Sequence, residues 1–533
     1  MFMNRKIINL ILLFAAICII CPVVVYMTNR TVCFRIKNGY EIVINARIGS
    51  TDLIIRPFYN DADKSYYFFL PHSISDKKIH NDLFGEKVTI DGKSISNLSG
   101  FNWDENKTYS IACKEAAYDI RFAEASDIAT LFITTESGNV DRINTDETYV
   151  ETGSMAILEP GGKVSYKGGI SIKGRGNFTY EMFNKRPFHI TLDESADILG
   201  MKKNKDWVLL ANTCDYSYMN NKLAFDMAKN AGFGFSPDAE YADVYFNGEF
   251  WGLYLVTEKI KVGDNRVEIT DLEKENKKSY PDVPDDITGG YLLERDHRTP
   301  NNKKPPSWFI SKDFDATHIR IRSPKYALDE ETEYISSLIN EMEHAIVSTD
   351  GYSQEGKYYT DYIDLNSWAN YYVISEIAYD TDFGLTSTFL YKDRDSIDPK
   401  IHMGPCWDFD QAFGAYPDHF SPEVLFKYPD TWFWDLYDKP EFHEEILKCW
   451  NSYYSDYLKN EAPARIEVWR EQIRSSVEND NIRWNRFDGY ERMIPWPMGG
   501  DEYGYEYYYD DQVDFFKDWL AKRQAFLDDC WKE

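Results

Sequence analysis

Several common catalytic signatures are missing from this sequence of 533 residues. It contains neither a Gly-x-Ser-x-Gly nor a His-Glu-x-x-His motif, so the sequence gives no support for a nucleophile-elbow hydrolase or a zinc metalloprotease. Of the eight cysteines, Cys18 and Cys21 lie in an apolar N-terminal run, and the others are scattered without zinc-ligand spacing. We expect mostly buried free thiols. One or two disulfides are the alternative if the chain lies outside the cytosol.

Positive charge is also scarce. The chain has 59 basic against 88 acidic residues, a net charge of −29. Such a field repels phosphate backbones and anionic membrane surfaces, so we expect no nucleic-acid partner. The hydrophobic content of 43% and the aromatic content of 16% are those of a globular chain that can bury a sizeable core.

Only one stretch is long and apolar enough to span a membrane. It covers residues 7–27 and follows Arg5 and Lys6. A helix of this length can cross a hydrocarbon core of about 30 Å, and cations on its N-terminal side favour a cytosolic N-terminus. We therefore predict that residues 1–30 form a cytosolic tip and a transmembrane signal anchor, with the bulk of the chain extracytoplasmic. A cleaved signal peptide is the alternative, although no good small-x-small cleavage site follows the run.

Short strands and turns dominate residues 31–160. Asp91 and Gly92 separate two short β-rich runs, which is a strong hairpin signal, and residues 128–133 form another β-rich run. We predict a β-sandwich-like domain here.

After this region the sequence shows patterns of both strands and helices. Helical spacing of apolar residues predicts helices near 329–346 and 364–379, each starting at an aspartate suited to capping. We expect an α+β domain over 161–430 and a helical C-terminal extension over 431–533. The sequence shows no internal repeat.

The most specific chemical pattern is acidic. Asp382 stands where a helix gives way to a strand over 388–391, and a second strand at 401–403 leads into a turn with Asp408 and Asp410. A hairpin of this kind can bring the three carboxylates together. Mg²⁺ prefers such oxygen ligands, and phosphoryl transfer needs the metal and a carboxylate that orients the hydroxyl. The alternative is structural, because turns are rich in Asp for backbone reasons alone.

Protein kinases divide the same work between an aspartate, a polar residue five positions later and a second aspartate after the next hairpin. Here Ser387 stands five positions after Asp382, where kinases have Asn. Asp408 would take the second aspartate's part. The chain lacks a His-Arg-Asp motif, and its Asp-Phe-Asp turn is not the kinase Asp-Phe-Gly.

Together these segments resemble the CotH family of kinase-like spore coat proteins. The resemblance rests on Trp-Asp-Phe-Asp and Phe-Gly within 407–414, downstream of the Asp-x-x-x-x-Ser-Thr strand. Further matching stretches lie at 172–180, 184–188, 199–212, 245–252 and 258–260. The match covers roughly residues 165–425 with five or six ordered motifs.

The resemblance implies an atypical protein kinase fold that uses ATP with Mg²⁺ or Mn²⁺. Asp382 would match the catalytic aspartate and Asp408 the metal-binding one. Asp410 would be an auxiliary ligand, with Ser387 at the position of the second metal ligand.

The resemblance also suggests contacts to the nucleotide. Lys185 is the candidate for its phosphates, and Glu258 is the candidate for orienting that lysine. Arg175 would bind phosphate or, alternatively, pair with a carboxylate in the core. An Arg that the family often has before Asn is replaced here, because Tyr218 and Met219 precede Asn220.

Two functions follow as expectations. The first is a membrane-anchored kinase that phosphorylates a hydroxyl on an envelope or coat protein. The second is an inactive kinase-like scaffold that acts as a surface-binding or structural protein. The scaffold gains support from the scarcity of ATP outside the membrane and from Ser387 in place of the usual metal ligand.

Overall fold

The computed structural model describes residues 30–37, 41–74, 78–81, 88–95, 101–113, 116–280, 282–296, 307–314, 317–380, 382–415, 421–485 and 508–532. The predicted membrane segment lies almost wholly outside these residues. Within the part of the chain that is described, no helix is both long and apolar enough to cross a membrane.

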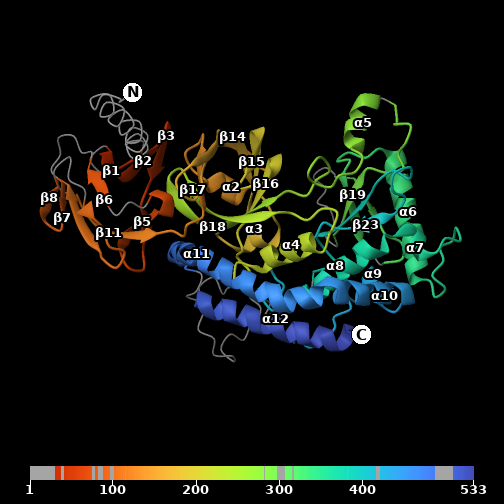
Figure 1. Cartoon of the computed structure of the whole chain (residues 1–533). Coiled ribbons are helices and arrows are strands. Elements are labelled where there is room, and N and C mark those ends of the chain that lie inside the picture. The colour runs from red at the N-terminus through yellow and green to blue at the C-terminus, as the bar shows by residue number, and fades with distance from the viewer. Residues whose placement is uncertain are drawn as a thin grey trace, which may run out of the picture.

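The first region consists of two sheets that share one core (Figure 1). One sheet has the order β3-β2-β1-β6-β9, with β1 Arg30–Lys37, β2 Glu41–Ile48, β3 Thr51–Ile55, β6 Lys78–Asn81 and β9 Phe101–Asn102. The other has the order β4-β5-β11-β10-β7-β8, with β4 Phe58–Asn60, β5 Ser65–Leu70, β7 Val88–Ile90, β8 Lys93–Ile95, β10 Tyr109–Cys113 and β11 Ala116–Glu124. The predicted hairpin at Asp91 and Gly92 is confirmed, since β7 and β8 pair around it.

Seven strands then close into a barrel in the order β12-β13-β14-β15-β16-β18-β17. They are β12 Ala129–Thr135, β13 Glu151–Leu158, β14 Val164–Gly174, β15 Phe188–Ile198, β16 Met201–Leu210, β17 Ala239–Phe246 and β18 Glu249–Glu258. Short helices α2 (Asp141–Thr145) and α3 (Phe178–Met182) lie between strands. Alternate apolar residues such as Leu131, Ile172 and Trp207 fill its interior.

The barrel begins earlier than the predicted boundary at residue 160. β12 and β13 belong to it, because β12 pairs in parallel with β17, more than a hundred residues later in the chain. A short apolar run fits a sandwich strand and a barrel strand equally well. Only the distant partner decides between them, and local pattern cannot supply that partner.

The next part combines a sheet of order β20-β21-β19-β22-β23 with helices. Its strands are β19 Tyr291–Asp296, β20 Trp308–Ile310, β21 His318–Ser323, β22 Thr388–Lys392 and β23 Ile401–Met403. Its helices are α4 Asn220–Asn230, α5 Leu272–Ser279, α6 Asp329–Val347, α7 Tyr359–Tyr362, α8 Leu365–Ala378, α9 Trp432–Tyr437 and α10 Pro440–Cys449.

Both predicted helices are confirmed there, as α6 and α8. The Asp364 side chain caps α8 by accepting from the Ser367 backbone N–H, whereas the N-cap of α6 is Leu328 and Asp329 is its first residue. α8 is buried along most of its length and forms the centre of the largest apolar core, with Trp368 fully buried.

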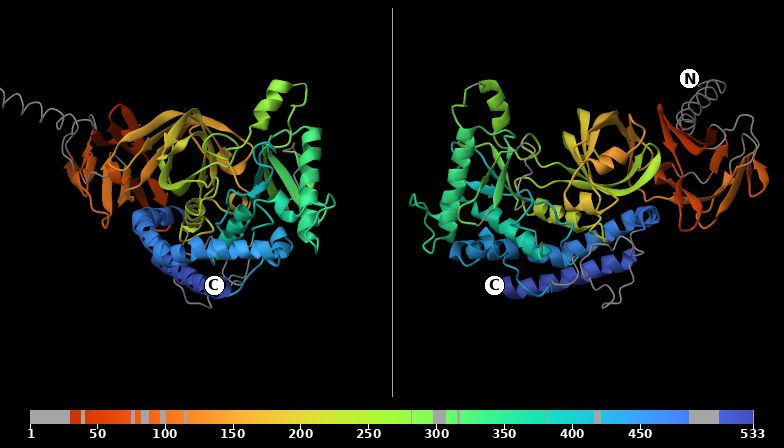
Figure 2. Two further views of the ribbon diagram at one scale, coloured as in Figure 1. Left: turned by 45° about the vertical axis from the view of Figure 1, so that its right-hand side comes forward. Right: turned by 180° about the vertical axis from the view of Figure 1, so that it is seen from behind.

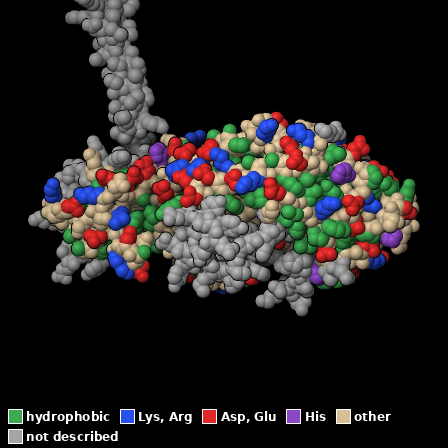
Figure 3. Space-filling view, turned by 90° about the horizontal axis from the view of Figure 1, so that it is seen from below, with side chains coloured by type: hydrophobic (Ala, Val, Ile, Leu, Met, Phe, Trp, Pro, Cys, Tyr) green, Lys and Arg blue, Asp and Glu red, His purple; other side chains and the backbone are tan. Residues whose placement is uncertain are grey.

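The C-terminal region is helical, as predicted. Two π-helical turns, Trp450–Tyr454 and Tyr457–Glu461, lead into α11 (Ala462–Trp484), and α12 (Tyr509–Trp531) packs beside it. Both views of Figure 2 show α11 and α12 running beneath the barrel and the helical part. The underside carries interspersed acidic and basic side chains, with more apolar ones toward its helical end (Figure 3).

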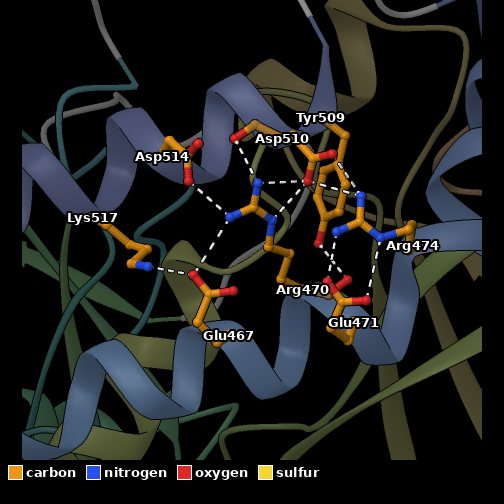
Figure 4. Close-up of polar contacts among 8 residues, drawn as sticks. All are labelled: Glu467, Arg470, Glu471, Arg474, Tyr509, Asp510, Asp514 and Lys517. Carbon is orange, nitrogen blue, oxygen red and sulfur yellow. Dashed lines mark hydrogen bonds and ion pairs between the residues drawn. The ribbon is translucent and has the colours of Figure 1, made fainter.

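Ion pairs join α11 to α12 (Figure 4). Arg470 contacts Asp510 at 2.7 Å and Asp514 at 2.8 Å, and Arg474 contacts Asp510 at 2.7 Å. Because one carboxylate of α12 lies between two guanidinium groups of α11, the register between the two helices is defined.

Candidate functional site

The acidic hairpin begins where α8 ends. Tyr379 adopts a left-handed conformation and closes the helix. The Asp382 carbonyl then accepts hydrogen bonds from the backbone N–H groups of Leu385 and Thr386, both at 3.0 Å, which forms the turn into β22. β22 pairs antiparallel with β23, and the chain continues to Asp408. The predicted hairpin is therefore present.

Ser387 and Asp408 meet at the open end of this hairpin. The Ser387 hydroxyl donates to Asp408 Oδ2 at 2.7 Å. Both residues have positive φ, 50° and 74°. Left-handed backbone at a non-glycine residue is uncommon; it occurs in turns, and it also clusters at functional sites.

Carboxylates crowd around this contact. Burial raises the pKa of Asp380 well above its ordinary value, and three nearby charges raise it further, those of Asp382, Asp408 and Asp410. Burial likewise raises the pKa of Asp410, with Asp408 and Asp382 adding to the rise. The structure thus brings the three predicted acidic residues close enough for their charges to act on the same carboxyl groups. Asp380 is buried and the other three carboxylates are half-buried, and carboxylates that repel each other in such a place favour a bound cation or a proton.

Two asparagines hold the loop that carries these carboxylates. Asn221 Oδ1 accepts from the Phe409 backbone N–H at 2.9 Å, and Asn220 Nδ2 donates to the Ala412 carbonyl at 2.9 Å. In the sequence, this stretch differed from the family by the absence of an arginine before Asn220. Its role as an anchor depends on a contact across nearly two hundred residues, which no local pattern reveals.

The donor set fits a hard cation. It consists of carboxylate and hydroxyl oxygens, the ligands that Mg²⁺ and Mn²⁺ prefer. In the described residues, no group of three or more His, Cys, Asp or Glu side chains is arranged as a ready cage. Mg²⁺ needs no such cage, because it commonly binds one or two carboxylates and takes its other ligands from phosphate and water. Asp408 and Asp410 would hold it.

Cations line the barrel wall opposite. Ile172 and Ile190 point into the barrel, so the alternating neighbours Lys173 and His189, which pair across β14 and β15, lie on its outer face. Arg175, just beyond β14, lies over the Trp407 ring at 5.3 Å, and the charge of Asp408 acts on its pKa. Arg175 is therefore the predicted nucleotide contact that the structure does bring to the acidic loop.

Lys259, directly after β18, joins this group. Burial lowers the pKa of its ammonium to about 8; the charge of Asp206 opposes this, and the positive charges of Arg322, Lys261 and Lys173 add to it. Lys173, Arg175 and Lys259 form no ion pair with any described residue. In a chain with a net charge of −29, unpaired cations that gather opposite carboxylates indicate an anion site.

Lys185 and Glu258 lie elsewhere than expected. The Lys185 ammonium is fully buried and pairs with Asp480 of α11 at 2.8 Å. Glu258 does not orient it, because its carboxylate pairs with Arg266. Lys259, next to Glu258, is the residue that sequence reasoning missed. Its signals in the sequence were the family-like stretch 258–260 and a position at the end of a predicted strand.

The structure thus combines a strand barrel with a helical lobe, and an acidic hairpin with a nearby group of cations. The family model described as CotH kinase protein matches residues 172–527, and the chain belongs to this family. The match extends through α11 and into α12, so the C-terminal helices are part of the family's domain. No curated protein matches the chain.

Proposed function

We propose that this protein transfers the γ-phosphoryl group of ATP to a hydroxyl on an envelope or coat protein. One observation carries the proposal: Asp382, Asp408 and Asp410 form an acidic cluster that faces cations without ion-pair partners. Membership of the CotH kinase family supports a kinase-like activity.

The two sides of the site divide the work. Lys173, Arg175 and Lys259 bind the phosphate oxygens of the nucleotide. Asp382 orients the attacking hydroxyl and accepts its proton as the oxygen bonds to the γ-phosphorus. The bond from that phosphorus to the bridging oxygen breaks, and ADP leaves.

A divalent cation bound by Asp408 and Asp410 would neutralise charge on the phosphate oxygens. The Ser387 hydroxyl keeps Asp408 oriented through their 2.7 Å contact. Asp410 is only half-buried, and the partial loss of water around it strengthens the electrostatic interactions of the site.

The location and the partner belong to the same proposal. The apolar run at 7–27, preceded by Arg5 and Lys6, supports a membrane-anchored protein with its kinase domain outside the cytosol. A protein of the surface or coat would then supply the hydroxyl.

The test is transfer of labelled γ-phosphate from ATP to a library of Ser, Thr and Tyr peptides, with Mg²⁺ and with Mn²⁺. Asp382→Asn should lower turnover about 100-fold or more, the range of a lost general base, while ATP still binds. Asp398→Asn is the matched control, because Asp398 lies on the same hairpin at its opposite end, beside His402. Full turnover by Asp382→Asn would refute the role of that residue.

A protein that binds no nucleotide and transfers no phosphate under any of these conditions would instead be an inactive scaffold. The two-sheet region would then be the place to search for a binding partner.

A further inference from the structure

Asp480, in the C-terminal half of α11, is fully buried and has three donors. Lys185 Nζ lies 2.8 Å from Oδ1, and the Leu253 backbone N–H donates to the same oxygen at 2.8 Å. The Tyr218 hydroxyl donates to Oδ2 at 2.8 Å. A buried carboxylate with an ion pair and two hydrogen bonds is held in one position.

Tyr218 connects Asp480 to the start of α4. It has a positive φ of 65°. Its backbone N–H donates to Asp215 Oδ1 at 3.0 Å, and its carbonyl accepts from the Tyr241 hydroxyl at 2.9 Å. Asp215 Oδ2 also accepts from the Asn220 backbone N–H at 2.8 Å. The side chain and the backbone of Tyr218 are therefore both fixed, directly before α4 begins.

The first two residues of α4 continue the chain of contacts to the acidic loop. Asn221 holds the Phe409 amide and Asn220 holds the Ala412 carbonyl, each at 2.9 Å. Those two backbone groups lie on either side of Asp410.

We infer that Asp480 is a positioning residue for the acidic loop, acting through Tyr218 and the asparagine pair at the start of α4. The inference rests on the proposed function and extends it: a helix at the far C-terminal end of the domain sets the geometry of the site. Repelling carboxylates do not hold one another in place, so their geometry depends on such backbone anchors. Small displacements of catalytic groups reduce rates severely, by about 100-fold for 1 Å.

The test compares two tyrosine variants of the full-length protein. Tyr218→Phe removes only the hydroxyl that reaches Asp480. Tyr245→Phe is the matched control, because Tyr245 is equally buried and its hydroxyl donates to the Phe69 carbonyl at 2.9 Å, remote from the loop. Each variant loses one buried hydrogen bond, and because the bond lost in Tyr218→Phe ends on a carboxylate, the unfolding midpoint should fall somewhat further in that variant than in the control.

Two readouts then separate positioning from stability. Amide hydrogen exchange of a peptide covering 407–412 should be roughly tenfold faster in Tyr218→Phe than in the control, because the Asn221 contact to Phe409 loosens. The kcat for phosphate transfer should fall by roughly tenfold in Tyr218→Phe alone. Asp480→Asn should change both readouts in the same direction.

Equal exchange at 407–412 in Tyr218→Phe and Tyr245→Phe would overturn the inference. Exchange does not depend on catalysis. Faster exchange together with an unmutated protein that transfers no phosphate would therefore leave the structural link in place and reject the proposed function.

Discussion

Gly252 shows how closely α11 approaches the barrel. It has a φ of 131°, and a Cβ at this position would lie 2.2 Å from Asp480 Oδ1. A side chain here meets both a strained backbone and an occupied space. The Gly in the Phe-Trp-Gly stretch is thus explained by one carboxylate oxygen of α11.

We predict that Gly252→Ala lowers the free energy of unfolding by about 2–4 kcal/mol, from backbone strain and overpacking together. Gly263→Ala is the control, because Gly263 has a similar φ of 139° but no atom within 4 Å of the added Cβ. Urea unfolding would measure both variants. Equal losses would mean that the contact with Asp480 does not constrain position 252.

Lys259 gives a second prediction at this scale. Lys259→Met should weaken ATP binding by about tenfold, the effect of one lost charge-assisted contact, with little change in melting temperature. Lys357→Met serves as control, since that side chain is 56% exposed, pairs with Glu355 and lies over the Tyr362 ring, away from the acidic loop. Titration calorimetry would measure the ATP affinity of both variants. Unchanged affinity in Lys259→Met would remove this residue from the phosphate site.

Individual site residues differed in how far the sequence could place them. Asp382, Asp408 and Asp410 were predictable, because they lie at one end of a local hairpin whose two strands the sequence predicts. Lys185 was not, because its carboxylate partner comes from residue 480, far along the chain. Spacing identifies neighbours within a hairpin but not across the fold.

Among the elements, α11 is fastened to the barrel by buried polar contacts. Ser476 Oγ donates to Asp243 Oδ2 of β17 at 2.8 Å, and its backbone N–H donates to Ser126 Oγ at 3.1 Å. Burial raises the pKa of Asp243 to about 8, and the charge of Asp480 adds to the rise.

This carboxyl makes stability depend on pH. The folded state keeps a proton that the unfolded chain releases above about pH 4, so Asp243 destabilises the fold progressively as the pH rises from about 4 to about 8. Asp243→Asn lacks this effect. The stability of the variant relative to the unmutated protein should increase between pH 5 and pH 8, as measured by urea midpoints at both values. A difference that does not change with pH would contradict the raised pKa.

The helices were more predictable than the strands. α8 has its apolar residues within fourteen residues and its capping aspartate directly before them, so local sequence suffices to place it. The barrel depends on the parallel pairing of β12 with β17, and a pairing between distant segments leaves no local trace. The domain boundary was therefore placed too late.

At the scale of the whole molecule, α11 touches each successive part. Asn479 Nδ2 donates to the Glu124 carbonyl of the two-sheet region at 3.2 Å, Ser476 contacts the barrel, and Arg465 pairs with Asp226 of α4 at 3.1 Å. The first region, the barrel and the helical lobe are consequently joined by one C-terminal helix (Figure 1). This arrangement agrees with a family match that runs to residue 527.

The central claim is that the acidic loop and the facing cations bind a metal–nucleotide complex. Calorimetric titration of ATP with Mn²⁺ into the protein, run beside Asp408→Asn and the control Asp398→Asn, tests it most directly. We predict metal-dependent binding that survives in Asp398→Asn and weakens at least about tenfold in Asp408→Asn, because a direct metal ligand is lost. Absence of binding by the unmutated protein, or equal binding by all three, would contradict the assignment of this site.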